Sequence, residues 1–330
     1  VAILDDYQNV THQFADWEIL NDKIELKVFN KYIGDDCAYL EDTKQLISTD
    51  SIAEYTHFDI KKFTAMQIAH RLFVSNFSDI QSSGGEPKYA LFNISFPKKK
   101  SILALSISKH LRNMIKKNKI TIIGGDTTSS KDIFLSLTLI SKKIDRSKVI
   151  LRSKSKVNDE IYLFKNIGFS KLGFLNLYQN LDIPSSLRKK SLKQFLHPKF
   201  YKYFDIFNKL PINSSMNISD SLYITIKEMA RLSNKKFVID NLSSVNPSLS
   251  NNLNYNKYMK LILSSGEEYV PVFTMKKNNL RKNTIAFFKK RGIEIVKIGN
   301  VKRGKGLVFQ NYNTKNIYSY NHFSENYLKL

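Results

Sequence analysis

The feature that most constrains this fold is an amphipathic segment that stands between two strand patterns. Residues 101–118, "SILALSISKHLRNMIKKN", carry apolar side chains at the spacing of a long helix. "EPKYALFNISF" before it alternates like a strand that begins at Pro87, and "KITIIGGD" after it opens as a short apolar strand. We therefore predict a strand, a helix and a second strand over residues 86–126.

Two further segments show helical periodicity. In residues 64–75 the apolar side chains at helical spacing are Ala65, Ile68, Ala69 and Leu72. In residues 217–233 those on one face are Leu222, Ile226 and Met229. Ser219 stands just before this second helix, where we expect it to cap the first turn.

Strands and helices alternate along the chain without a strict βαβ rhythm, which favours α+β layers over a doubly wound sheet. A length of 330 residues is sufficient for two domains. The charged stretch "KKIDRSKVILRSKSKVND" has little apolar periodicity, so we place the boundary within it. The predicted parts are an atypical N-terminal segment over 1–30, a first domain over 31–145 and a second over 146–330.

The balance of 52 Lys and Arg against 29 Asp and Glu gives a formal charge of +23, which invites a nucleic-acid interpretation. Most of the basic residues are lysines scattered through segments such as "FPKKKS" and "NLRKN". No zinc-finger spacing or aromatic RNA-binding motif accompanies them. Attraction of anionic nucleotides, or a lysine-rich proteome, explains the charge equally well, so we do not expect nucleic acid to be the main partner.

The chain carries no sign of membrane insertion or export. No apolar run approaches the roughly 20 residues of a membrane span, and the acidic opening "VAILDDYQNV" lacks the basic region of a signal peptide. The single cysteine, Cys37, excludes an internal disulfide framework and fits a reducing compartment. We expect a cytoplasmic protein with no membrane partner.

The stretch "IIGGDTTSS" at residues 122–130 allows two interpretations. Its glycines could let the backbone approach an anion, with Asp126 as a hard oxygen ligand for a cation. A tight turn in which Asp126 caps the next element would use the same residue types. Taken alone, the stretch favours the turn.

Acidic residues are a minority in this chain, yet they gather in five short loops with apolar flanks. The residues of interest in these loops are Asp35, Asp36, Ser48, Thr49, Asp50, His57, Asp79, Asp126, Asn217, Ser219 and Asp220. Carboxylates at strand and helix ends can converge on several Mg²⁺ ions, which keep water ligands and bridge to phosphates. Each loop also has a capping or turn explanation, but five together favour a metal cluster.

Several competing chemistries have no support in the sequence. There is no GxxxxGK[ST] phosphate loop and no protein-kinase catalytic loop. The glycines of "NIGFSKLG" are too loosely spaced for a dinucleotide motif, and one cysteine excludes a cysteine-histidine metal site. His57 is a lone histidine near aromatic neighbours, for which a hydrogen-bonded structural role is the default.

Seven motifs follow one another along the chain: "IGDDCAYL", "ISTDSIAEYTHF", "NFSDIQSSGGEP", "IIGGDTT", "ILRSKSKVNDEIYL", "NISDSL" and "SSGEEY". In this order they resemble the thiamine-monophosphate kinase family over about residues 31–330. The resemblance implies the two-domain α+β fold of the aminoimidazole-ribonucleotide-synthetase-like ATP-binding superfamily, with an N-terminal domain that binds ATP and Mg²⁺ and forms a homodimer. It also implies transfer of the ATP γ-phosphoryl group to thiamine monophosphate, giving thiamine diphosphate and ADP.

The resemblance implies roles for individual positions. Expected Mg²⁺ ligands are Asp36, Ser48, Thr49, Asp50, Asp79, Asp126 and Asp220, together with Asn217 where the family usually has aspartate. Expected ATP contacts are Gly125, Arg152 and Ser219. Expected substrate contacts are His57, Glu267 and Phe323, the last stacking on a thiamine ring. Metal neutralisation and in-line positioning need no covalent protein nucleophile, and none is evident.

The chain departs from the family pattern at several of these motifs. Ser221 replaces a glycine, "SGEEYVP" replaces "GGEDYEL", and Arg71 replaces a lysine. The first thirty residues instead resemble the opening strand of D-2-hydroxyacid dehydrogenases, although no dinucleotide loop follows. A non-catalytic nucleotide-binding protein with a degraded site of the same fold is the alternative to the kinase.

Overall fold

The computed structural model describes residues 2–4, 27–29, 35–179, 181–277, 281–314 and 317. Within these residues, the chain builds one five-stranded and one six-stranded sheet, plus a parallel pair formed by β1 (Ala2–Leu4) and β2 (Lys27–Phe29). The remainder of the predicted N-terminal segment lies outside the described residues. Two hydrophobic cores, one for each large sheet, account for most of the buried apolar side chains.

The five-stranded sheet has the order β3-β4-β7-β5-β6. Its strands are β3 (Ala38–Leu40), β4 (Gln45–Ala53), β5 (Pro87–Phe96), β6 (Thr121–Ser129) and β7 (Phe134–Ser141). All neighbours are antiparallel except β5 and β6, which run parallel and are connected by α3 (Ser101–Lys117). The predicted strand, helix and strand are thereby confirmed. Single 3-10 turns, η2 (Lys98–Lys100) and η3 (Arg146–Lys148), lie in the connections.

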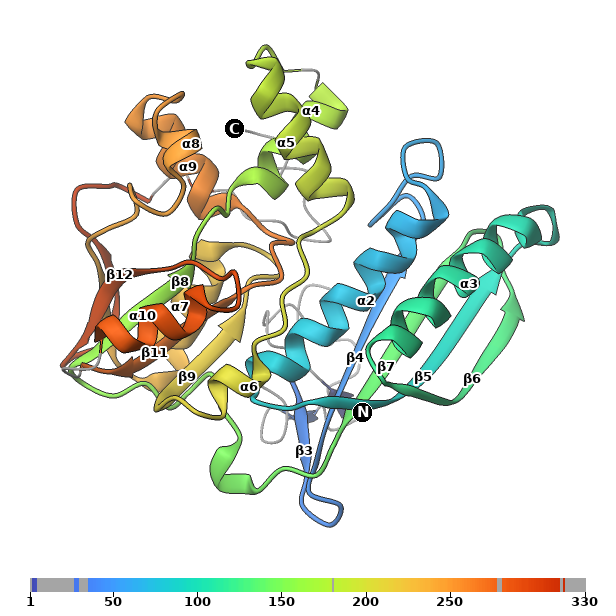
Figure 1. Cartoon of the computed structure of the whole chain (residues 1–330), viewed down its shortest axis with the longest axis horizontal. Helices are drawn as coiled ribbons and strands as arrows, with labels where there is room; N and C mark the ends of the chain where they lie inside the picture. The colour runs from blue at the N-terminus through green and yellow to red at the C-terminus, as the bar shows by residue number, and fades with distance from the viewer. Residues whose placement is uncertain are drawn as a thin grey trace, which may run out of the picture.

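Helices α2 (Ala65–Ser82) and α3 lie side by side along the first sheet (Figure 1). Thr64 caps α2 through a reciprocal pair of hydrogen bonds with Gln67. Helix α3 buries a single stripe, whereas every residue of α2 from Ile68 to Ser82 is buried. The second half of the chain covers the side of α2 that the sheet leaves open, so α2 is a central element of the whole molecule.

The six-stranded sheet has the order β13-β10-β12-β8-β11-β9. Its strands are β8 (Asp159–Phe164), β9 (Ile212–Asn217), β10 (Lys236–Ile239), β11 (Pro271–Lys276), β12 (Ile295–Lys302) and β13 (Gly306–Phe309). The accompanying helices are α4 (Phe169–Gln179), α5 (Ser185–Leu196), α6 (Phe204–Phe207), α7 (Leu222–Ser233), α8 (Pro247–Ser250), α9 (Tyr255–Ser264) and α10 (Arg281–Lys289). Adjacent strands are antiparallel except β10 and β13.

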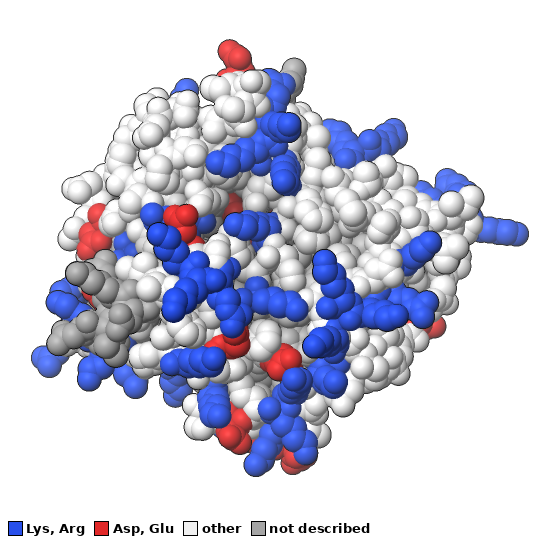
Figure 2. Space-filling model, viewed as in Figure 1, with Lys and Arg blue, Asp and Glu red and all other residues white. Residues whose placement is uncertain are grey.

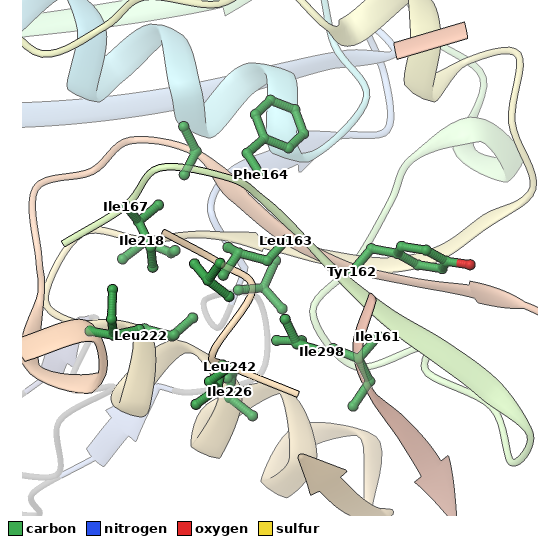
Figure 3. Close-up of a cluster of buried hydrophobic side chains, with 14 of the residues drawn as sticks. Ile161, Tyr162, Leu163, Phe164, Ile167, Ile218, Leu222, Ile226, Leu242 and Ile298 are labelled. Atoms are coloured by element: carbon green, nitrogen blue, oxygen red, sulfur yellow. The ribbon is translucent and has the colours of Figure 1, made fainter. Parts of the chain in front are cut away.

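Strand β8 is buried on both faces and organises the second core (Figure 3). Ile161 and Leu163 belong to the cluster that includes Leu222 and Ile226 of α7. The predicted apolar face of α7 is therefore confirmed. The predicted cap was wrong by two residues, because the Ser221 hydroxyl, rather than that of Ser219, accepts the hydrogen bond from the first turn of α7.

The mixed layers confirm the α+β class. The first sheet ends at Ser141 and the second begins at Asp159, but the predicted domain division at 145/146 remains a prediction. None of the described helices is both long and apolar enough to cross a bilayer. Lys and Arg side chains spread over much of the face seen in Figure 2, with a few acidic side chains among them.

Candidate functional site

A cleft of about 380 Å³ lies between the two halves of the molecule. One wall comes from β4 and the loop after it, which contribute Asp50 and His57. The opposite wall comes from the loops before α7 and after α9, which contribute Ser219, Asp220 and Glu267. Five side chains predicted for metal, ATP or substrate binding, from distant parts of the chain, thus meet at one cleft.

A group of buried carboxylates lies next to this cleft. Alternation along β4 turns Ser48 and Asp50 toward α2, where the Ser48 hydroxyl donates to Asp79 Oδ2 at 2.7 Å. The backbone N–H of Asp50 donates to Asn76 Oδ1 on the same helix at 2.9 Å. Strand β4 and helix α2 therefore hold Asp50 and Asp79 in fixed positions.

Electrostatics in this group is dominated by burial and by like charges. Burial, together with the nearby carboxylates of Asp36 and Asp220, raises the pKa of Asp50 to about 6. Burial raises the pKa of Asp79 well above its usual value, with added repulsion from Asp50 and Asp36. Carboxylates that repel one another in a buried site become favourable when a cation neutralises them.

Asn217 and Arg152 bind directly to these carboxylates. The Asn217 side-chain amide donates to Asp79 Oδ1 at 2.6 Å and to Ser78 Oγ at 2.9 Å. Arg152 Nη2 donates to Asp36 Oδ1 at 2.7 Å, while its backbone N–H donates to Asp35 Oδ1 at 2.6 Å. The residue that departs from the family's aspartate is thus part of the cluster, and Arg152 is an ion-pair partner of Asp36.

The cluster fits a hard divalent cation by the chemistry of its donors. Among the described residues, no three Asp, Glu, His or Cys side chains already surround one metal position. The carboxylates accept hydrogen bonds from protein donors, such as those that Asp79 accepts from Ser48 and Asn217. Carboxylate oxygens are the protein ligands that Mg²⁺ prefers, so Asp36, Asp50, Asp79 and Asp220 are the side chains that suit it.

The "IIGGDTT" motif lies elsewhere. It forms part of the exposed strand β6, so the interpretation of this stretch as a tight turn was wrong. Gly125 is required because a Cβ there would lie 1.8 Å from the Phe92 carbonyl oxygen of β5. Strands β7 and β5 separate β6 from β4, which at ~4.8 Å per strand places Asp126 roughly 14 Å from Asp50. Within one chain these two side chains are not brought together.

Thr49 was predicted to bind a metal ion, and Phe323 was predicted to contact the substrate. The Thr49 side chain lies on the opposite face of β4 from Asp50 and accepts a hydrogen bond from Thr138 Oγ1 at 2.9 Å. Its side chain is therefore not part of the buried cluster in this chain. Phe323 lies outside the described residues.

Comparisons with known proteins place the chain in a family. Residues 34–142 match the AIR synthase related protein, N-terminal domain family. A thiamine-monophosphate kinase from Buchnera aphidicola is 34% identical over 89% of this chain and 92% of its own length. The Leptospira interrogans thiamine-monophosphate kinase is 36% identical over 72% of this chain and 77% of its own length. The chain belongs to the thiamine-monophosphate kinase family.

The fold agrees with this membership of the thiamine-monophosphate kinase family. A solved structure described as "AaThiL complexed with AMPPCP and TMP" superposes with a TM-score of 0.72, covering 87% of this chain and 90% of that one at 23% identity. The predicted superfamily fold is confirmed.

Sequence reasoning on this family member missed the aromatic lining of the cleft. The lining includes Tyr55, Phe58, Phe174, Tyr178 and Phe195. The four-residue spacing of Phe174 and Tyr178 on α4 indicates a shared helix face, but nothing in the sequence places that face against the loop after β4. His57 Nδ1 accepts the Ala53 backbone N–H at 3.1 Å, which leaves the proton of the neutral ring on Nε2.

Proposed function

We propose that this protein transfers the γ-phosphoryl group of ATP to thiamine monophosphate, giving thiamine diphosphate and ADP. Membership of the thiamine-monophosphate kinase family supports the reaction. The structural observation that carries it is the cleft between the two halves, where Asp50 and His57 on one wall face Asp220 and Glu267 on the other. The carboxylates of the cleft suit phosphates with their cations, and its aromatic side chains suit an organic acceptor.

In the reaction, a phosphate oxygen of thiamine monophosphate attacks the γ-phosphorus of ATP, and the bond from that phosphorus to the β-phosphate oxygen breaks. Both substrates are anions, so the site has to overcome their repulsion and align them. Bound Mg²⁺ would neutralise and bridge the phosphates. Asp36, Asp50, Asp79 and Asp220 would hold the cations, and Ser219 and Arg152 would contact ATP.

The aromatic lining suits the acceptor rings. Thiamine contains a pyrimidine and a cationic thiazolium ring, and both can stack on side chains such as Tyr55, Phe58 and Phe174. The Glu267 carboxylate, 32% exposed at the cleft wall, can accept a hydrogen bond from the pyrimidine amino group or attract the thiazolium charge. Ring recognition would therefore depend on both halves of the chain.

We also propose that the protein forms a homodimer through strand β6. Strand β6 is exposed along its length, including Ile122 and Ile123, and its outer edge pairs with no strand in the described part of the chain. Unpaired strand edges favour association with another strand. A second copy covering this surface would explain why Gly125 and Asp126 lie far from the cluster of their own chain, since they could serve the partner's cleft. Such a biosynthetic enzyme would work in the cytoplasm.

The test is incubation of the protein with ATP, Mg²⁺ and thiamine monophosphate, with thiamine diphosphate separated and quantified by chromatography. We expect one ADP per thiamine diphosphate, and no product when thiamine monophosphate is replaced by thiamine. Calorimetric titration with ATP accompanies the assay. ATP binding without product across a wide range of Mg²⁺ concentrations would overturn the proposal in favour of a non-catalytic nucleotide-binding protein.

A further inference from the structure

Arg71 is a fully buried cation in the middle of α2. Its guanidinium lies between two aromatic rings, 5.2 Å from the Phe63 centroid and 4.7 Å from the Phe195 centroid. A planar guanidinium stacks well on ring faces, whereas a lysine ammonium would not fill this space in the same way. The rings therefore fix the plane of the Arg71 side chain.

The donors of Arg71 reach two parts of the cleft wall. Nη2 donates to the Phe195 carbonyl oxygen at 2.6 Å, at the end of α5. Nη1 forms an ion pair with Glu267 Oε1, the one ion pair of Arg71 among the described residues. Phe195 and Glu267 both line the cleft, although Arg71 itself does not. Arg71 thus ties two wall segments to the helix that carries Asp79.

The backbone of Glu267 is fixed independently of its side chain. Its φ is +52°, and its N–H donates to the Ser219 carbonyl oxygen at 2.5 Å. The preceding residue must be glycine, because a Cβ at Gly266 would lie 2.1 Å from the Asp220 carbonyl oxygen. Tight packing against the loop before α7 therefore sets the main chain, which leaves Arg71 to set the direction of the carboxylate.

On the basis of the proposed function, we propose that Arg71 is a positioning residue for the acceptor: it holds the Glu267 carboxylate in the orientation that receives the thiamine rings. One oxygen of the Glu267 carboxylate pairs with the Arg71 guanidinium, and the rest of the partly exposed Glu267 side chain faces the cleft. The pair also keeps this wall close to neutral, which limits the cost of covering it with an organic ring. The side chains that we expect to contact ATP, Ser219 and Arg152, are not members of this pair.

The experiment measures steady-state kinetics and calorimetric binding of ATP and of thiamine monophosphate separately. Arg71→Lys keeps the charge but loses the planar fork, so we expect the KM for thiamine monophosphate to rise roughly 10- to 100-fold, the scale of a lost charge-assisted hydrogen bond. We expect kcat and the affinity for ATP each to change by less than about threefold, which corresponds to well under 1 kcal/mol. Glu267→Gln should give a similar rise, and the double variant no more than the larger single effect, because both changes break one interaction.

Arg231→Lys, which alters an exposed ion pair with Glu228 on α7, is the matched control and should keep the wild-type KM. If Arg71→Lys fails to give a wild-type unfolding transition, Glu267→Asp carries the test. It keeps the charge but retracts the carboxylate, so it should raise the KM almost as much as Glu267→Gln.

Independent, multiplying effects of the two substitutions, or an equal loss of ATP affinity, would overturn the proposal and leave Arg71 as a core residue. So would a wild-type KM in Glu267→Asp. Absence of turnover in the wild-type protein would instead count against the proposed function, and calorimetric binding of thiamine monophosphate to the same variants would still test Arg71.

Discussion

Asp50 is a carboxyl group whose environment opposes its charge. Burial and neighbouring carboxylates raise its pKa to about 6, so a bound cation is needed to make the ionised form favourable. We expect Asp50→Asn to reduce kcat/KM for ATP by roughly 100-fold or more, since losing a metal ligand costs several kcal/mol of transition-state stabilisation. Asp42→Asn, in the exposed turn after β3, is the control. Wild-type kinetics for Asp50→Asn at limiting Mg²⁺ would show that Asp50 is not a ligand.

Asn217 contributes a neutral donor where a carboxylate would repel Asp79. In Asn217→Asp the 2.6 Å hydrogen bond to Asp79 becomes a contact between two buried carboxylates. We expect a loss of roughly 1–3 kcal/mol of stability without Mg²⁺, and a recovery on adding Mg²⁺ that exceeds the wild-type response. Thermal unfolding at several Mg²⁺ concentrations measures both.

The matched control for Asn217→Asp is Asn213→Asp. Asn213 also donates to a carboxylate, at 2.9 and 3.0 Å from the oxygens of Asp159, but Asp159 is not one of the clustered carboxylates Asp36, Asp50, Asp79 and Asp220. It should lose stability without a comparable Mg²⁺ recovery. Equal Mg²⁺ responses in the two variants would separate Asn217 from the metal site.

At the scale of elements, helix α4 begins on a buried carboxyl group. Glu268 Oε1 accepts the backbone N–H of Gly168 at 2.6 Å and of Ser170 at 3.3 Å, and it also accepts the Ser265 hydroxyl. Burial raises the pKa of Glu268 from about 4.5 to about 7, although these donors oppose the rise. The helix start is therefore capped by a group that resists ionisation.

The pH dependence of this cap has a definite sign. Between pH 4.5 and 7 the unfolded chain loses the Glu268 proton while the folded chain keeps it, so the free energy of unfolding falls as pH rises. Glu268→Gln keeps the acceptor but cannot ionise, so it should be more stable than wild type at pH 8, by up to about 3 kcal/mol, and similar at pH 4. Urea unfolding at both values is the measurement, with exposed Glu294→Gln as control. A destabilised variant at pH 8 would contradict this.

The elements differ in how far the sequence could predict them. Helices α3 and α7 follow from apolar periodicity because each buries one stripe. Helix α2 was predicted from Ile68 and Leu72. The burial of its polar residues could not be predicted, because the segments that cover them belong to the second half of the chain. The β6 motif was misassigned because glycines suggest a turn, whereas Gly125 serves close strand pairing.

The parts of the candidate site that depend on tertiary packing could not be predicted either. The loops with Asp36, Asp50 and Asp220 could be linked by motif order, but Arg71 and the aromatic lining are defined only by tertiary packing. The roughly 14 Å between Asp126 and Asp50 follows from strand order, which no local pattern encodes.

At the scale of the whole molecule, two histidines join the halves. His70 of α2 stacks on His197 with centroids 3.6 Å apart, and His70 Nε2 donates to the Pro198 carbonyl oxygen at 2.7 Å. Burial, with the nearby cations, lowers the pKa of His70 from 6.5 to about 4. The unfolded chain therefore takes up a proton between pH 6.5 and 4 that the folded chain refuses, and stability falls as the pH falls through this range.

This effect is worth up to about 3 kcal/mol at pH 4. His70→Gln keeps a donor for Pro198 but does not titrate, so its unfolding free energy should change less between pH 4 and 6.5 than that of wild type. Urea unfolding across this range is the measurement, with His110→Gln on α3 as control. An unchanged pH slope in His70→Gln would exclude His70 as its source.

Because α2 is buried from Ile68 to Ser82, neither half of the chain is complete without the other. The first core also takes in Phe195 and Tyr269 from the second half, and Gln81 of α2 accepts the backbone N–H of Tyr203 at 2.7 Å. Two sheets do not, then, imply two independent folding units. We expect one cooperative transition for the whole chain in calorimetry, and no native-like melting for an isolated 31–145 fragment. A version of this protein that is split into two chains would therefore fold only if both chains associate around α2. A cut that leaves α2 without the second half would expose its buried polar residues.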